Sequence, residues 1–384
     1  MTRDHEIHVA KPKEPTCPDA LPRSSGFRSR LPFIQHFERH SREWSVTLAL
    51  SALLLLLAVL APGFFQRNQL LSIATAATPV LLVACGVSLV IITRQIDISV
   101  GSQFALSSVT LGLLVQAHWP IPLAALTAVL FCTCCGAFNG LLIGGLGLPS
   151  IVVTLATMVT WREALRWWRQ GEFVRDLPDT FQWFGLGQGR GQTVIIIVGI
   201  TSFGVLVFAL KNLAAGRFIY AVGSDAEAAR LAGIRPAAVT FGAFVMLGTL
   251  TGLAALLNAV RFSDVDPKTG TGLELQAIAA AVGGGVAISG GRGRLWGVLV
   301  GVLLLACITP ALVFLRLPPQ WEKAVQGCII LLAVAVGGLR PAQGRGRLLV
   351  SRRLIALSLE ERVEVSGNRA SQSPCPSVPT KRSQ

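Results

Sequence analysis

The chain is poor in charged residues, and long stretches of it carry none at all. Charged residues make up 14% of its 384 positions, whereas apolar residues make up 52% and the mean hydropathy is +0.60. A soluble globular domain does not have this balance, because its surface needs far more charge. We therefore expect an all-α, polytopic membrane protein.

The apolar runs also lack the side chains from which most enzymes build an active site. They contain no histidine, and their only notable acids are Asp97, near a polar break, and Glu274, at the start of a run. None of the eight cysteines has a convincing metal-ligand spacing. The glycine-rich segment 185–193 lacks the Lys-Ser/Thr ending of a Walker A loop. We predict no catalytic residue, metal or cofactor, and any ATP hydrolysis must come from a partner.

What the chain does have is a strong positive charge outside the apolar runs. Its formal net charge is +14, concentrated in the two tails and in loops rather than on one folded face. This distribution indicates a positive-inside orientation in a lipid membrane and gives no support for a nucleic-acid partner. We expect basic, disordered cytoplasmic tails at residues 1–45 and 341–384, and a transmembrane domain at residues 46–340.

Ten apolar runs predict about ten transmembrane helices. Polar or glycine-rich interruptions at 93–102 and 289–294 predict that some of these helices are broken or re-entrant. An even number places both termini on one side, which the basic tails assign to the cytoplasm. The expected spans are 46–65, 70–92, 104–117, 123–146, one beginning at 151, 193–210, 239–260, 273–288, 295–315 and 324–339.

One charged segment, GSDAEAARLAGIRP at 223–236, predicts a helix of about two turns between two spans. Ser224 and Glu227 have the spacing of a capping box, and Gly233 is a suitable C-terminal stop. A helix this short does not persist alone in water. We interpret it as a helix offered to a partner at the membrane face, with a polar connector as the alternative.

The polar groups inside the spans are mostly neutral hydroxyls and amides, which suit an uncharged, hydroxyl-bearing solute. Hydroxyls and amides also hold neighbouring membrane helices together, and this reading is equally open. Asp97 lies three residues after Arg94, and the spacing favours an ion pair between them. The break at 96–102 is echoed at 287–293, which indicates either a transporter-type repeat or a chance likeness.

Five segments in order, at 92–102, 139–158, 223–234, 269–297 and the closing WEKAVQGCIILLAVAV, resemble the permease subunits of ribose-type carbohydrate ABC importers. The resemblance covers roughly residues 46–340. Within that family, residues 169–188 look most like rhamnose permeases, with autoinducer-2 permeases next. The sequence departs from the family at GGGVAISGG, where a bulkier residue more often follows the first two glycines.

The resemblance implies an inner-membrane permease subunit that translocates a monosaccharide, with rhamnose-like solutes favoured and autoinducer-2 or ribose-like ones next. It implies a second permease subunit, identical or homologous, two cytoplasmic ATP-binding subunits and a periplasmic sugar-binding protein. The binding protein would dock on outer loops, where Arg261, Asp264, Asp266 and Lys268 offer charges. An ion-coupled secondary sugar transporter and a non-transporting scaffold remain the alternatives.

Two sets of residues are candidates for these roles. The resemblance identifies the helix in segment 223–236 as the ATPase-coupling helix, with Ser224, Asp225, Glu227, Ala228, Arg230, Leu231 and Gly233. The polar residues near the two breaks are the candidate translocation path: Asp97, Ser99, Ser102, Asn139, Thr154 and Glu274.

Overall fold

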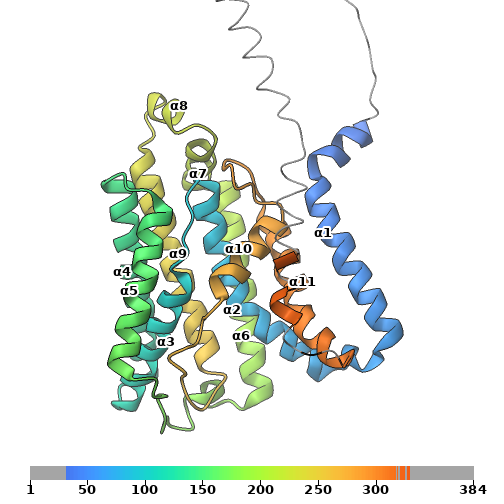
Figure 1. Cartoon of the computed structure of the whole chain (residues 1–384), viewed down its shortest axis with the longest axis vertical. Helices are drawn as coiled ribbons and strands as arrows, with labels where there is room; N and C mark the ends of the chain where they lie inside the picture. The colour runs from blue at the N-terminus through green and yellow to red at the C-terminus, as the bar shows by residue number, and fades with distance from the viewer. Residues whose placement is uncertain (1–31, 317, 319–320, 325–326, 329–384) are drawn as a thin grey trace, which may run out of the picture. The chain divides into compact units, whose positions relative to one another are not determined.

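The computed structural model of the chain describes residues 32–316, 318, 321–324 and 327–328. Contacts divide the chain into Met1–Ser41 and Arg42–Gln384. Apart from the start of α1, the features below belong to the second unit. Helices make up nearly all of the regular structure described (Figure 1). They are α1 (Pro32–Leu60), α2 (Arg67–Ile92), α3 (Val100–Gln116), α4 (Ile121–Gly140), α5 (Ser150–Arg169), α6 (Gln188–Asn212), α7 (Ala214–Ser224), α8 (Ala226–Leu231), α9 (Pro236–Ala259), α10 (Leu273–Gly283) and α11 (Leu295–Phe314).

The helices confirm an all-α, polytopic membrane protein. Five of those described are long and apolar enough to span a bilayer: α2, α4 with the π turn Leu141–Gly145, α6, α9 and α11. Helix α1 begins at Pro32, before the expected start of the first span, because no glycine or proline interrupts residues 33–45. The expected tenth span at 324–339 extends beyond the described residues, and the tail at 341–384 lies outside them.

Two shorter apolar helices confirm the broken segments. Helices α3 and α10 have 17 and 11 residues, which give lengths of about 25 and 16 Å, less than the roughly 30 Å of a bilayer core. Before α3, the chain leaves the helix at Thr93 and Arg94, the latter with φ 65°. After α10 it turns at Gly285 with φ 96°, so this helix ends five residues before the expected 288.

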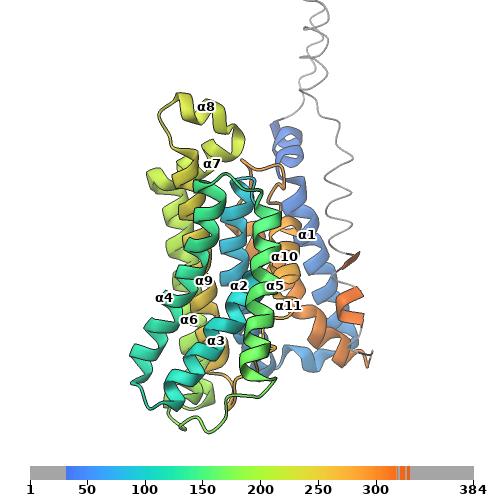
Figure 2. The same cartoon turned by 60° about the vertical axis from the view of Figure 1, so that its left-hand side comes forward.

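Close helix packing holds the centre of the bundle together. Helix α9 packs against α4, α2 and α3 (Figure 2). A side-chain carbon added at Gly136 of α4 would lie 2.4 Å from the carbonyl oxygen of Phe244, and one at Gly248 would lie 2.6 Å from that of Cys132. Small residues at such contacts allow the two backbones to approach, as is usual in membrane proteins. This rigid core positions the polar groups described next.

Candidate functional site

The short charged helix exists as α8, and Asp225 caps it. The Asp225 carboxylate accepts hydrogen bonds from the backbone N–H groups of Glu227 at 2.9 Å and Ala228 at 3.1 Å. Our expectation of a Ser224 cap was wrong, because Ser224 is the last residue of α7 whereas Asp225 has the extended backbone that a cap requires. Glu227 accepts a hydrogen bond from Arg230 at 2.6 Å instead of closing a capping box.

Helix α8 presents its surface to the outside of the described fold. Ala229 is its one buried residue, and Leu231 is 81% exposed. Gly233, with φ 83°, ends the helix as expected, and Ile234 donates its N–H to the Ala229 carbonyl at 3.0 Å. A capped turn that exposes a leucine offers a preformed apolar contact to another protein.

Arg94 ties α8's neighbour, α7, to the first broken helix. Its Nε donates to the carbonyl oxygen of Gly223 at 2.7 Å, and its Nη2 donates to that of Ser224. The expected Asp97–Arg94 pair is therefore wrong: Arg94 leaves α2 with a left-handed backbone, and its side chain reaches the C-terminal end of α7. We call Arg94 with these two carbonyls the clamp.

The second glycine-rich break lies against the clamp. The N–H of Gly291 donates to the carbonyl of Ile92 at 2.9 Å, and a side-chain carbon at Gly223 would lie 1.8 Å from the same oxygen. Tyr220 of α7 donates its hydroxyl to the Gly293 carbonyl at 2.9 Å. Both breaks and the end of α7 thus meet directly beside the start of α8.

Past the clamp, the first break carries a fully buried polar cluster of Asp97, Ser99, Gln103 and Asn139. The Asp97 carboxylate accepts from Ser99 N–H at 2.7 Å, from Ser99 Oγ at 2.6 Å and from Gln103 Nε2 at 3.2 Å. Asn139 of α4 donates to Ser99 Oγ at 2.9 Å. The hydrogen-bond partners of the Asp97 carboxylate are neutral groups, so the cluster holds a carboxylate among amides and hydroxyls.

Four buried polar atoms of α3, α4 and α9 have no hydrogen-bond partner among the described residues. They are Gln103 Oε1, Asn139 Oδ1, Ser108 Oγ and Thr251 Oγ1. An unpaired buried polar group costs about 1–3 kcal/mol, so such groups in a membrane protein point to a functional role. Sequence reasoning missed Gln103 and Thr251; the position of Gln103, one helical turn after Ser99, was the available signal.

The structure does not bring all the predicted path residues together. Asp97, Ser99 and Asn139 share the cluster. Ser102 of α3 donates its hydroxyl to the Met158 carbonyl of α5 at 2.8 Å, which joins the two helices as the packing alternative expected. Thr154 of α5 donates to the Ser150 carbonyl of its own helix at 2.9 Å and to the Ile96 carbonyl, beside the cluster, at 3.4 Å.

Glu274 lies apart from the cluster, in the first turn of α10. Its Oε1 accepts from the Gly272 N–H at 3.2 Å, and its Oε2 is buried without a hydrogen-bond partner among the described residues. A side-chain carbon at Gly101 of α3 would lie 2.3 Å from that Oε2. Glu274 thus lies against the first turn of α3.

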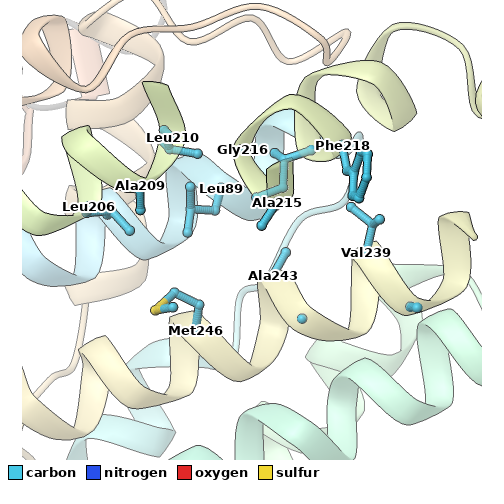
Figure 3. A pocket seen from close by; sticks show the side chains of 13 residues that line it. Leu89, Leu206, Ala209, Leu210, Ala215, Gly216, Phe218, Val239, Ala243 and Met246 are labelled. Atoms are coloured by element: carbon cyan, nitrogen blue, oxygen red, sulfur yellow. The ribbon is translucent and has the colours of Figure 1, made fainter. Parts of the chain in front are cut away.

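An apolar cavity of about 370 Å³ lies among α2, α6, α7 and α9. Figure 3 shows side chains of α6 and α7, including Leu206 and Phe218, across the cavity from Val239 and Met246 of α9. Every side chain that lines it is apolar. Such a wall offers a hydroxylated solute no hydrogen bond, so we do not place the solute path here.

Comparison with known proteins gives a consistent result. Residues 69–334 match the family described as the branched-chain amino acid transport system / permease component. The autoinducer 2 import system permease protein LsrC of Escherichia coli O9:H4 (strain HS) is 36% identical over 317 residues, which cover 80% of this chain and 91% of that protein. LsrC of Salmonella typhi is 33% identical over 319 residues, covering 80% and 89%. No solved structure matches.

Proposed function

We propose that this chain carries an uncharged, hydroxyl-bearing solute. The premise is that it belongs to the family described as the branched-chain amino acid transport system / permease component. As a permease component of an ABC importer it resides in the inner membrane and is not itself catalytic. The import system includes ATPase and solute-binding partners. What we propose is the solute class, the surface on which the ATPase docks, and the side of the membrane on which α8 and the termini lie.

The polar cluster is the observation that carries the proposal. Around the buried Asp97 carboxylate it presents amide and hydroxyl groups in the bundle core, and two amide oxygens, Gln103 Oε1 and Asn139 Oδ1, have no partner among the described residues. Neutral groups of this kind exchange hydrogen bonds with a hydroxylated solute at little electrostatic cost. The names of the relatives favour autoinducer 2 over the rhamnose-like solute that the resemblance placed first.

The second part of the proposal is the route of coupling. The ATPase subunits bind the exposed Leu231 face of α8, which places α8 and both termini in the cytoplasm. Closure of the ATPase pair on ATP moves α8 and α7 as one unit, because Asp225 directly follows Ser224. The clamp passes this motion to the break that carries the cluster, which changes the side of the membrane to which the cluster has access.

A reconstituted uptake assay tests the proposal. The permease is placed in proteoliposomes with the ATPase and binding protein of its own import system, and uptake of labelled autoinducer 2, rhamnose and ribose is followed with and without ATP. We expect ATP-dependent uptake of at least one of them. Uptake of none, with the assembled complex still hydrolysing ATP, would refute the proposed solute class.

Asp97 also gives a reason to test an ion-coupled secondary transporter, because a buried carboxylate is a typical proton or ion site. That alternative predicts uptake without the ATPase, abolished by a protonophore. The permease alone, under an imposed proton gradient, distinguishes the two. Our proposal expects no uptake in this arm.

A further inference from the structure

A second cavity, also of about 370 Å³, lies at the end of the bundle opposite α8, where α9 leads into the loop before α10. We call it the outer pocket. Its volume falls within the range of small-molecule sites, roughly 300–1,000 Å³. Unlike the apolar cavity beside α7, it is lined by rings and polar groups: Ser108, Phe173, Asn258, Phe262, Asp264 and Asp266 are among its residues.

The walls of the outer pocket are fixed to one another. Val174 and Val265 exchange two backbone hydrogen bonds, each 3.0 Å long, and both side chains are buried. This bridge joins the loop that carries Phe173 to the loop that carries Phe262 and Asp264. The pocket is therefore formed before any ligand binds, which lowers the entropy lost on binding.

Both aromatic rings of the pocket are held by arginines. The guanidinium of Arg175 lies 5.8 Å from the centre of the Phe173 ring, and that of Arg261 lies 5.4 Å from the centre of the Phe262 ring. The rings are 43% and 49% exposed. They supply apolar faces beside carboxylate and amide groups, a combination that suits a small solute with hydroxyls on an apolar frame.

Ser108 supplies the strongest sign of a ligand. It lines the pocket, it is 1% exposed, and its Oγ has no hydrogen-bond partner among the described residues. It lies on α3, the helix that carries Ser99 and Gln103 of the polar cluster. An unpaired hydroxyl in the wall of this pocket can pair with a hydroxyl of a bound solute.

We propose that the outer pocket is an entry site that binds a small, uncharged, hydroxyl-bearing solute before it reaches the polar cluster. The proposal rests on the function proposed above. Docking of a binding protein on the charges of this loop stays a prediction. Within the loop itself, Asp266 accepts the backbone N–H of Lys268 at 2.8 Å, and Arg261 donates to Asn258 at 3.2 Å. Two of the four charged groups are thus bonded within the pocket's own wall and loop.

Saturation-transfer difference NMR on the permease in lipid nanodiscs tests the entry site. The probes are autoinducer 2 and L-rhamnose, with glycine betaine as a small probe that has no hydroxyl. Phe262→Ala removes an exposed ring, and Ser108→Ala removes only an unpaired hydroxyl, so neither change disturbs a hydrogen bond. Asp264→Asn and Asp179→Asn are matched changes inside and outside the pocket, the second at an exposed position.

We expect a signal for at least one hydroxylated probe and none for glycine betaine. Phe262→Ala should abolish it, Ser108→Ala should weaken binding about fivefold, and Asp264→Asn should weaken it while Asp179→Asn does not. Equal signals in all variants, or no signal from a preparation that transports the same probe, would overturn the entry site. If these binding results hold but ATP drives no uptake, the outer pocket stands as a solute-binding site, whereas its role in entry and the proposed import function both fail.

Discussion

Replacing Arg94 with alanine should uncouple ATP hydrolysis from transport without preventing assembly. The change removes the two clamp hydrogen bonds, from Nε to Gly223 and from Nη2 to Ser224. Arg94 and Ser224 are exposed, so we assign each bond about 1 kcal/mol, the usual net value. The sum of about 2 kcal/mol changes the docking equilibrium between α7 and the first break roughly 30-fold.

Uptake and ATP hydrolysis measured on the same proteoliposomes give the number of ATP molecules hydrolysed per solute imported. Arg94→Ala should raise the ATP used per solute imported at least about tenfold, while the ATPase still co-purifies because α8 is intact. Arg217→Ala is the matched control, since this exposed arginine donates a long hydrogen bond, to the Asn212 carbonyl at 3.4 Å. An unchanged ratio in assembled Arg94→Ala complexes would refute the clamp.

Backbone strain is a separate effect that a second variant isolates. Arg94 has φ 65°, a conformation that costs a residue with a side chain about 1–2 kcal/mol. Arg94→Gly relieves that strain but still lacks the guanidinium. Our account predicts that Arg94→Gly is as uncoupled as Arg94→Ala; recovery of coupling in the glycine variant would show that side-chain bonding is not the cause.

Three further outcomes follow from single contacts. Asp225→Ala should loosen α8 by about 1 kcal/mol, seen as faster amide hydrogen exchange there, whereas Glu227→Gln, which loses an exposed ion pair, should have little effect. Asp97→Asn should preserve thermal stability, since an amide oxygen can still accept both Ser99 hydrogen bonds and Gln103 Nε2 keeps its bond to Ser99 Oγ at 2.8 Å, but Asp97→Leu should lower the melting temperature by leaving the Ser99 N–H and Oγ–H without acceptors. Gly136→Ala should lower it too, because the added carbon meets the backbone of α9, whereas Gly204→Ala has open space and should not.

Much of the fold could be predicted because the length of an apolar run indicates whether a helix can span the membrane. The spans of α2, α6, α9 and α11 are long uninterrupted runs, and the glycines at 283–285 mark the end of α10. The exact cap of α8 could not be read, because Ser224 and Asp225 are both good cap residues. The choice depends on where α7 ends, which tertiary packing decides.

The candidate site was harder to predict from the sequence, because its contacts also depend on tertiary packing. Spacing along a helix suggested that Asp97 pairs with Arg94, but no helix connects them: the backbone turns at Arg94. The partner of Arg94 is about 130 residues away in sequence. Such long-range hydrogen bonds have no local signature. The same holds for the outer pocket, whose walls come from segments far apart in the sequence that the Val174–Val265 bridge and the Trp183–Val260 backbone hydrogen bond join.

The central claim is that another protein's nucleotide moves this bundle through α8. The most direct measurement is ATP-driven uptake by the complete system carrying Leu231→Glu, which replaces the 81% exposed apolar contact with a charge. Our account predicts that this variant inserts normally, fails to retain the ATPase and imports nothing. Uptake at the unmodified rate, or equal uptake with the ATPase left out, would contradict it.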